Sequence, residues 1–317
     1  MNHLSRPRFI TSLGLLVFAG TAPVAHAALL VYEGFDYALN ARLDTLAPNS
    51  STIGLNTGVT YYDAPSSVRT VAFTVQNGLS FARLQTTGGA LAFGTGTNVI
   101  GADISATNFT GTLWSSYLVR LAASSNGSGS GNGVAIRVGD TPADSSDSSF
   151  TSWADSRSGT LQKLAVGHGA GATSVDGNNA LAPDTTYIII NRFTRVGQAI
   201  SVSTPGVATS WALTEAQYAL FLDQSNGEAW LDSASGLSSV TSTAMHTNST
   251  SSTRTFSSSR STSIVTVGMA GTYDELRFGS TLADVTPTAV PEPASTSVIM
   301  GIGCGFLILC CRTSRRR

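Results

Sequence analysis

The feature that most restricts the fold of this chain is a series of short runs in which every second residue is apolar. Val134, Ile136 and Val138, for example, are separated by single residues. Successive side chains of a strand point to opposite faces, so each such run gives a strand one apolar face. Turn-forming pairs such as Asn77 followed by Gly78 separate the runs. Many short strands with little helix predict an all-β fold, a two-sheet sandwich of jelly-roll type.

The strands that we expect lie in short segments spread over the whole body of the chain. One helix is expected over residues 214–222, because Thr214 suits the N-cap and Gln217 completes a capping box. Residues 233–263 are mostly Ser and Thr with few apolar side chains, which predicts a long mobile surface loop. The expected strands are residues 29–33, 67–73, 80–84, 113–122, 133–138, 163–167, 186–192, 199–204, 264–268 and 272–278.

The two ends of the chain have the composition of targeting segments. Residues 1–27 combine an arginine-containing start, an apolar run too short to span a membrane and the small residues Ala25 and Ala27. This pattern predicts a signal peptide cleaved before Ala28, with an uncleaved anchor as the alternative. The sandwich body would then span residues 28–287, followed by a tail over residues 288–317.

The tail has three parts in a fixed order. A rigid Pro291, Glu292, Pro293 hinge precedes an apolar segment, for which we expect a transmembrane helix over residues 295–311. The 18 residues 294–311 give about 27 Å of helix, barely the thickness of a bilayer. Positive residues that follow a membrane helix favour the cytoplasmic side. These residues are Arg312, Arg315, Arg316 and Arg317.

This order of parts at the extreme C-terminus resembles a PEP-CTERM sorting signal. The resemblance implies a chain exported with the help of signal peptidase and held transiently in the inner membrane, facing the periplasm. It also implies that an exosortase recognises the Pro291-Glu292-Pro293 motif and releases or transfers the protein to the cell surface or the extracellular matrix.

Charge and cysteine content restrict the function of the body. Six of the 18 basic residues and one of the 19 acidic residues lie in the terminal segments, so residues 28–289 carry 12 basic and 18 acidic residues, a net charge of -6. An acidic body of this kind excludes nucleic acid as a partner. Cys304, Cys310 and Cys311 all lie in the tail, so the body contains no disulfide.

The body resembles the concanavalin A-like (laminin G-like) jelly rolls. The segments that carry the resemblance are residues 30–37, 113–120, 186–190 and 273–279. In this family the first and last strands pair. Its members bind glycans, calcium or proteins, and some relatives hydrolyse or cleave polysaccharides, so the fold alone does not fix the activity.

The acidic residues do not form an obvious catalytic pair. A retaining glycosidase needs two carboxylates about 5 Å apart. Glu33 and Asp36, like Asp274 and Glu275, are spaced so that strand geometry turns them to opposite faces. We therefore expect no catalytic residue, and turn and edge hydrogen bonds for these carboxylates. His168, alone in a glycine-rich segment, is expected to face solvent.

Two groups of residues are candidates for binding. The acidic segment with Asp140, Asp144 and Asp147 offers oxygen ligands for calcium, the one cofactor that we consider. It lacks the ordered spacing of a known calcium loop, which favours the alternative of a solvated turn. Trp153 and Trp230 lie in polar surroundings, where an exposed ring would stack on a sugar. The alternative for the two tryptophans is packing at the edge of the sandwich.

Together these patterns predict an exported, non-enzymatic protein with a binding or structural role toward extracellular polysaccharide. Two alternatives stay open at this point. One is a polysaccharide hydrolase or lyase of the jelly-roll class whose carboxylates converge only in three dimensions. The other is a matrix or coat component that associates with itself.

Overall fold

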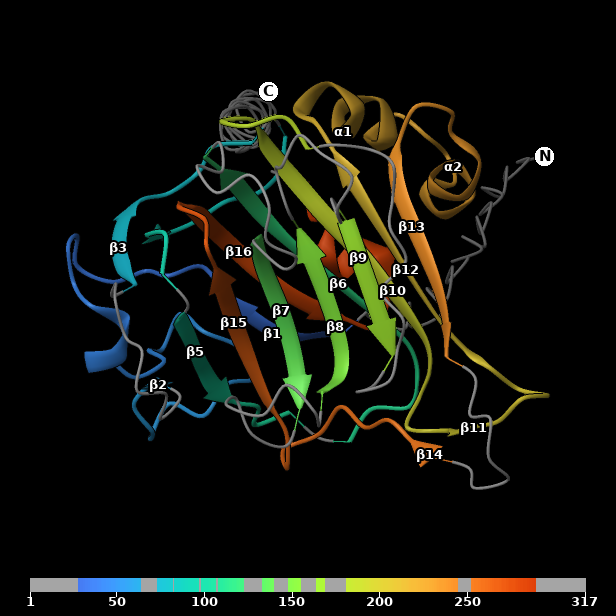
Figure 1. Cartoon of the computed structure of the whole chain (residues 1–317), viewed down its shortest axis with the longest axis horizontal. Helices are drawn as coiled ribbons and strands as arrows, with labels where there is room; N and C mark the ends of the chain where they lie inside the picture. The colour runs from blue at the N-terminus through green and yellow to red at the C-terminus, as the bar shows by residue number, and fades with distance from the viewer. Residues whose placement is uncertain are drawn as a thin grey trace, which may run out of the picture.

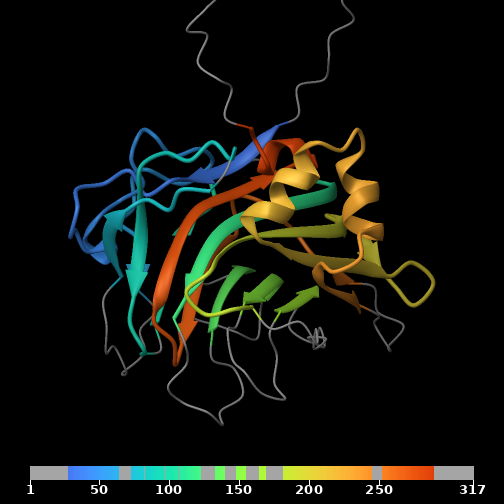
Figure 2. The same cartoon turned by 90° about the horizontal axis from the view of Figure 1, so that it is seen from above.

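A computed structural model describes residues 28–63, 73–81, 83–96, 98–106, 108–122, 133–139, 148–154, 164–168, 181–244 and 252–288. Two antiparallel β-sheets pack face to face, and the helices lie on the outer side of the larger sheet (Figures 1 and 2). This arrangement confirms the predicted all-β sandwich of jelly-roll type.

The larger sheet has eight strands in the order β13-β12-β10-β6-β16-β4-β3, with β1 also paired to β16. Val31 lies opposite Phe278, so the first and last strands of the body are neighbours, as the resemblance implied. The strands are β1 (Leu29–Glu33), β3 (Thr74–Asn77), β4 (Gly89–Phe93), β6 (Gly111–Leu121), β10 (Thr186–Val196), β12 (Gly206–Leu213), β13 (Ser238–Ala244) and β16 (Gly271–Gly279).

The smaller sheet has six strands in the order β2-β5-β15-β7-β8-β9. A separate two-stranded ribbon joins β11 to β14 at one end of the sandwich. The strands of the smaller sheet are β2 (Tyr62–Asp63), β5 (Asn98–Asp103), β7 (Gly133–Gly139), β8 (Ser148–Ala154), β9 (Leu164–His168) and β15 (Ser261–Val267), and those of the ribbon are β11 (Ala199–Ile200) and β14 (Ser252–Thr253).

The main core fills the space between the two sheets. Phe150 of β8 meets Phe193 of β10 across this space, with ring centroids 5.1 Å apart. Tyr117 of β6 stacks on Tyr273 of β16 within the larger sheet, and both rings are fully buried. Rows of alternating residues from every long strand thus meet between the sheets, which is the packing that period-two patterns predict.

A second apolar cluster lies on the side of the larger sheet that is turned away from the main core, beneath three helices. Trp114 and Trp211 stack there with ring centroids 6.2 Å apart, and Phe221 and Leu282 pack in the same cluster. We call this side of the sandwich the helical face. The helices are α1 (Glu215–Leu222), α2 (Gly227–Ser233) and α3 (Leu282–Val285), and a 3-10 turn, η1, spans Leu43–Thr45 elsewhere.

The helix α1 confirms the prediction for residues 214–222. Thr214 is the N-cap, its side chain accepts from the backbone N–H of Gln217, and the Gln217 side chain accepts from the N–H of Thr214. This reciprocal pair satisfies two backbone donors that a helix start leaves without intrahelical partners.

The prediction of a loop over residues 233–263 is wrong for a large part of that segment. It contains β13, β14 and the first residues of β15, and Val240 is a buried member of the main core. Thr and Ser side chains suit a strand when one face is covered, and β13 pairs with β12 along its length. A composition rule that counts apolar residues overlooks such strands.

Two further predictions need correction. Residues 80–84 form no strand, since Leu84 makes only an isolated bridge to Thr288. The strand expected over 199–204 ends at Ile200, followed by a turn in which Ser201 and Thr204 exchange backbone hydrogen bonds. Residues 67–72 lie outside the described residues.

The first and last described residues lie close together. The N–H of Ala28 donates to Oγ of Ser280 at 3.1 Å, just before α3, and the N–H of Gln85 donates to the carbonyl of Pro287 at 3.1 Å. Both ends of the body therefore lie at the helical face (Figure 2). Within the described ranges, no helix is long and apolar enough to cross a bilayer. The predicted signal peptide, sorting motif and transmembrane helix lie outside these ranges.

Candidate functional site

The carboxyl group of Glu33 is buried among hydrogen-bond donors at the end of β1. Its Oε1 accepts from the N–H of Phe35 at 2.7 Å, and its Oε2 accepts from the hydroxyls of Tyr37, at 3.2 Å, and Tyr61. Removal from water raises the pKa of Glu33 to about 7, although these hydrogen bonds act in the opposite direction. Asp36, by contrast, is exposed and does not join Glu33.

Asp274 and Glu275 lie at a bulge in β16. The register against β6 shifts between Asp274 and Arg277, and Glu275 has a left-handed backbone with φ of 56°. Asp274 accepts from the N–H of Leu79 at 2.7 Å, and Glu275 accepts from the N–H of Thr87 at 2.5 Å. The two carboxylates therefore attach both ends of the connection between β3 and β4 to β16.

Burial also affects the ionisation of this pair. Desolvation, with the charge of Glu275 as the next cause, raises the pKa of Asp274 to about 8. Desolvation likewise raises the pKa of Glu275, while Arg277, paired with it at 2.5 Å, acts to lower that pKa. The expected hydrogen-bonding role of these carboxylates is confirmed, because each accepts a hydrogen bond from a backbone N–H.

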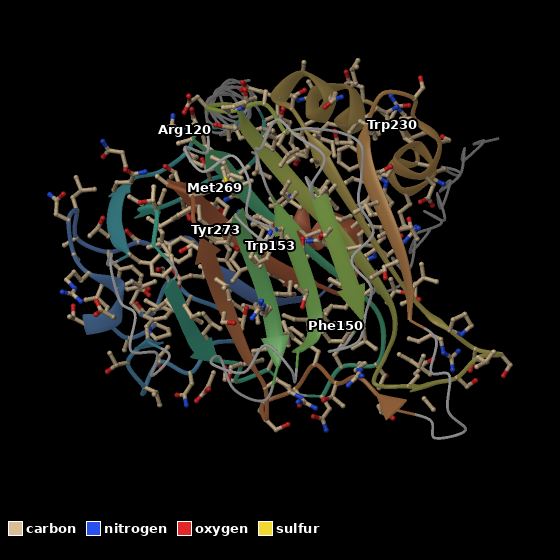
Figure 3. All side chains as sticks on the ribbon, viewed as in Figure 1. Arg120, Phe150, Trp153, Trp230, Met269 and Tyr273 are labelled. Atoms are coloured by element: carbon tan, nitrogen blue, oxygen red, sulfur yellow. The ribbon has the colours of Figure 1, made fainter. Side chains whose placement is uncertain are left out.

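The outer face of the smaller sheet carries an aromatic side chain, Trp153. Trp153 of β8 lies between its directly paired neighbours Ala135 of β7 and Ala165 of β9. The adjacent positions in β8 face inward, since Ala154 belongs to the main core and Ser152 lies within 3.1 Å of the Tyr117 hydroxyl. Trp153 therefore points away from the core (Figure 3). We call this side of the sandwich the outer face.

The surroundings of Trp153 are small side chains. Ala135 and Ala165 are buried, whereas Trp153 itself is partly exposed. Its Nε1 is shielded from water and finds no acceptor in the part of the chain that the structure describes. A Cβ on Gly133 would lie 2.9 Å from this nitrogen, so the glycine leaves room for the indole edge. A partly exposed ring thus lies between two buried alanines.

Arg137 lies on the same face, one row further along the sheet. It pairs with Ser263 of β15 on one side and with Thr151 of β8 on the other. Thr151 is two residues from Trp153 on the same side of β8, so Arg137 and Trp153 are diagonal neighbours, about 7–8 Å apart at Cα. Arg137 is partly buried, and desolvation lowers the pKa of its guanidinium.

Trp230 lies on the other side of the sandwich. It belongs to α2, and its ring packs against Phe221 at a centroid distance of 6.0 Å. The structure therefore does not bring the two predicted sugar-stacking residues together, because Trp153 and Trp230 lie on opposite outer sides (Figure 3). Trp114, also on the helical face, is 2% exposed, and Arg192 lies over its ring.

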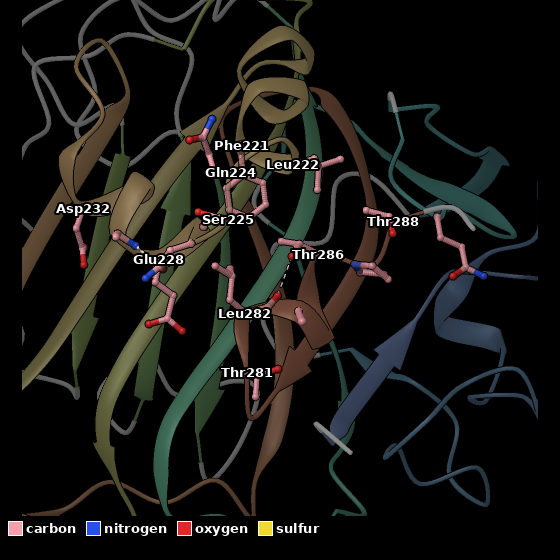
Figure 4. Close-up of a pocket in the computed structure, with 16 residues that line it drawn as sticks. Phe221, Leu222, Gln224, Ser225, Glu228, Asp232, Thr281, Leu282, Thr286 and Thr288 are labelled. Atoms are coloured by element: carbon pink, nitrogen blue, oxygen red, sulfur yellow. Dashed lines mark hydrogen bonds between the residues drawn. The ribbon is translucent and has the colours of Figure 1, made fainter. Parts of the chain in front are cut away.

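A cavity of about 1070 Å³ opens on the helical face, between the α1–α2 pair and α3 (Figure 4). Gln224, Asn226 and Glu228 bring amide and carboxylate groups to one wall, and Thr281 and Thr286 bring hydroxyls to the other. Phe221 is the one aromatic residue among those that line it, and its ring is buried. The cavity offers hydrogen bonds but no ring face for a sugar.

Asp140, Asp144 and Asp147, the predicted calcium ligands, lie outside the described residues. Of the ranges that are described, none gathers three His, Cys, Asp or Glu side chains in a way that would hold a metal ion. The calcium site stays a prediction.

No known family matches this sequence, and no curated protein is similar to it. Among solved structures, domain 4 of the extracellular arabinanase AbnA from Geobacillus stearothermophilus, in complex with arabinotriose, is 11% identical, covering 82% of this chain and 97% of that one with a TM-score of 0.39. The winged bean acidic lectin complexed with methyl-α-D-galactose is 6% identical, covering 78% and 98%, with a TM-score of 0.38. Alginate lyase Aly36B, in complex with alginate tetrasaccharide, is 14% identical, covering 79% and 97%, also at 0.38. At such values none of these similarities says what this chain binds, and its fold class follows from its own sheet topology.

Sequence reasoning selected Trp153 but not Arg137. The alternation of Val134, Ile136 and Val138 already placed Arg137 on the face away from the core. Its position beside Trp153 depends on the register in which β7 pairs with β8, the next strand along the chain. Only the register of the sheet brings the two side chains together.

Proposed function

We propose that this chain is an exported, non-catalytic protein that binds extracellular polysaccharide on the outer face of the smaller sheet. The observation that carries the proposal is Trp153, a partly exposed ring flanked on both sides by alanine. The flat apolar side of a sugar ring fits against an aromatic face, and small neighbours leave room for the rest of the sugar.

The buried carboxylates support a non-catalytic role. Glu33, Asp274 and Glu275 are 0–1% exposed and are engaged by backbone N–H groups. A carboxylate that acts on a glycosidic bond has to reach the substrate. These three groups hold the loops at the paired terminal strands instead.

Export and sorting belong to the same proposal. The signal sequence would direct the chain out of the cytoplasm, and the tail with Pro291, Glu292 and Pro293 would hold it in the inner membrane until an exosortase acts on it. The protein would then work at the cell surface or in the polysaccharide matrix. The first and last described residues of the body lie at the helical face, on the other side of the sandwich from Trp153.

Glycan binding is tested with the full chain, purified in detergent, on an array of polysaccharides. We expect retention on at least one polymer, and a loss of about tenfold or more in affinity for Trp153→Ala, since one aromatic contact is worth on the order of 1–2 kcal/mol. Trp230→Ala is the matched control and should bind as the wild type does.

The same experiment separates the alternatives. Equal binding by Trp153→Ala and the wild type would exclude the outer face as the site, and no retention on any polymer would contradict the glycan-binding function. Release of new reducing or unsaturated ends from a bound polymer would show an enzyme instead. Repeating the array with EDTA tests the calcium prediction for Asp140, Asp144 and Asp147.

A further inference from the structure

We propose that the ligand of the outer face is an acidic polysaccharide whose uronate carboxylate pairs with Arg137. This inference rests on the proposed glycan-binding function and names the class of glycan. The side chains that carry it belong to the smaller sheet, and the charged one is Arg137.

The first step is the state of Arg137. It is partly buried, and within the described part of the chain its guanidinium makes no hydrogen bond or ion pair. Two other buried or half-buried arginines are engaged: Arg277 pairs with Glu275, and Arg192 pairs with Asp232 through two hydrogen bonds at 3.0 and 2.8 Å. A guanidinium with five donors is costly to shield from water without an acceptor. The described residues therefore leave the donors of Arg137 for an anion.

The second step is the surroundings of Arg137. Its neighbours across the sheet are Ser263 and Thr151, both neutral, and next in the same row come Gly101 and Gly167. Asp103 is the acidic residue on the described part of this face. It lies two strands away in β5, where the hydroxyl of Ser261 donates to it at 2.9 Å. Among the described residues, no acidic side chain is therefore a direct neighbour of Arg137 in the sheet, although the body as a whole is acidic.

The third step is the relation of Arg137 to Trp153. The two residues are diagonal neighbours on one face, with Cα atoms about 7–8 Å apart. A sugar ring placed on the indole would bring a substituent of the same or the next residue over Arg137. A carboxylate there can accept two parallel hydrogen bonds from the planar guanidinium, a geometry that a hydroxyl cannot match. Trp153 would give affinity for a sugar, and Arg137 would select an acidic one.

The test compares charged and neutral forms of the same polymers. The full chain in detergent is titrated with polygalacturonate and with polymannuronate, each beside its methyl-esterified counterpart, and with dextran sulfate beside dextran. We expect the wild type to prefer a polyuronate over its ester by about 10–100-fold, the range that hydrogen bonds to charged groups give. The preference should weaken with rising salt.

Three variants make the test specific. Arg137→Gln should lose the preference for the free acid but keep the weaker binding of the ester, and Trp153→Ala should weaken both. Arg120→Gln is the charge-matched control, because Arg120 is an exposed arginine on the larger sheet, and it should behave as the wild type does. Thermal unfolding of each variant shows whether it is folded.

The outcomes distinguish this inference from the proposed function. Equal binding of acid and ester, unchanged in Arg137→Gln, would overturn the uronate assignment and leave glycan binding intact. Equal affinity for dextran sulfate and the polyuronates would also overturn it, because that result indicates charge alone. Failure to bind any polymer, charged or neutral, would remove the proposed function itself.

Discussion

Glu33 is a carboxyl group with almost no contact with water, and it shows what burial does to a single residue. It is 1% exposed and accepts hydrogen bonds from one backbone N–H and two tyrosine hydroxyls. In the sequence it stands beside Gly34 and Phe35 without any sign of this environment. The burial arises because β1 pairs with β16 and because Tyr61, 28 residues later, folds back onto the carboxyl group.

A stability that falls as pH rises follows from the pKa values of the buried acids. The folded-state pKa is about 7 for Glu33 and about 8 for Asp274, whereas unfolded Glu and Asp titrate at about 4. Between these values the folded chain binds more protons than the unfolded chain, so the free energy of unfolding decreases with pH. We expect the highest unfolding temperature near pH 5 and a clearly lower one at pH 9, measured by circular dichroism.

Glu33→Gln identifies the contribution of Glu33 to this effect. The amide oxygen can accept from the N–H of Phe35, and the amide NH2 can donate to the tyrosine hydroxyl oxygens. The amide does not titrate, so the slope between pH 5 and pH 8 should become shallower. A slope of the opposite sign in the wild type, or one that Glu33→Gln leaves unchanged, would contradict the assignment.

At the scale of elements, β13 (Ser238–Ala244) shows where composition misleads. Its sequence, Ser-Ser-Val-Thr-Ser-Thr-Ala, contains few apolar side chains, yet it pairs with β12 over seven residues and contributes Val240 to the main core. A strand at a sheet edge needs apolar residues on only one face, and hydroxyl side chains suit the other. The pairing partner, not the local sequence, makes this segment a strand.

Substitution of Val240 tests whether this position belongs to a strand of the core or to a mobile loop. Val240 is 5% exposed, so Val240→Ala should lower the free energy of unfolding by about 1–3 kcal/mol through lost burial. Thr241 is the next residue and is exposed, so Thr241→Ala should change it by less than about 0.5 kcal/mol. Equal, small effects in chemical denaturation would show that β13 is not part of the core.

At the scale of the whole molecule, the two outer sides of the sandwich have different roles. The helical face is covered by α1, α2 and α3 and holds both ends of the body (Figure 2). Trp153 lies on the opposite side (Figure 3), and Arg137 is its diagonal neighbour in the sheet. A tail that anchors the chain in a membrane would therefore place the helical face toward the bilayer. The outer face would point away from it, toward an extracellular polymer.

Site-specific fluorescence tests this orientation. Single cysteines are introduced by Thr151→Cys on the outer face and by Ala283→Cys on α3, in a chain whose tail cysteines, Cys304, Cys310 and Cys311, are replaced by serine. In reconstituted vesicles, a quencher attached to lipid headgroups should quench a dye at position 283 far more than one at 151. Equal quenching, or stronger quenching at 151, would contradict the proposed orientation.

The sequence alone was sufficient for the properties that depend on local pattern. Period-two alternation predicted most of the long strands and the inward face of β7, and the Thr214–Gln217 capping box predicted the start of α1. These properties are local because strand alternation and helix capping depend only on residues a few positions apart.

Only the tertiary structure decided the features that depend on which strands pair and in which register. It placed Arg137 beside Trp153 through the pairing of β7 with β8, and it turned Ser/Thr-rich residues into β13. It also brought the buried carboxyl groups of Glu33 and Glu275 onto neighbouring strands, β1 and β16. Pairing partners far apart in the chain are selected by the packing of the whole sandwich, because a strand finds its register only when its apolar face meets a common core.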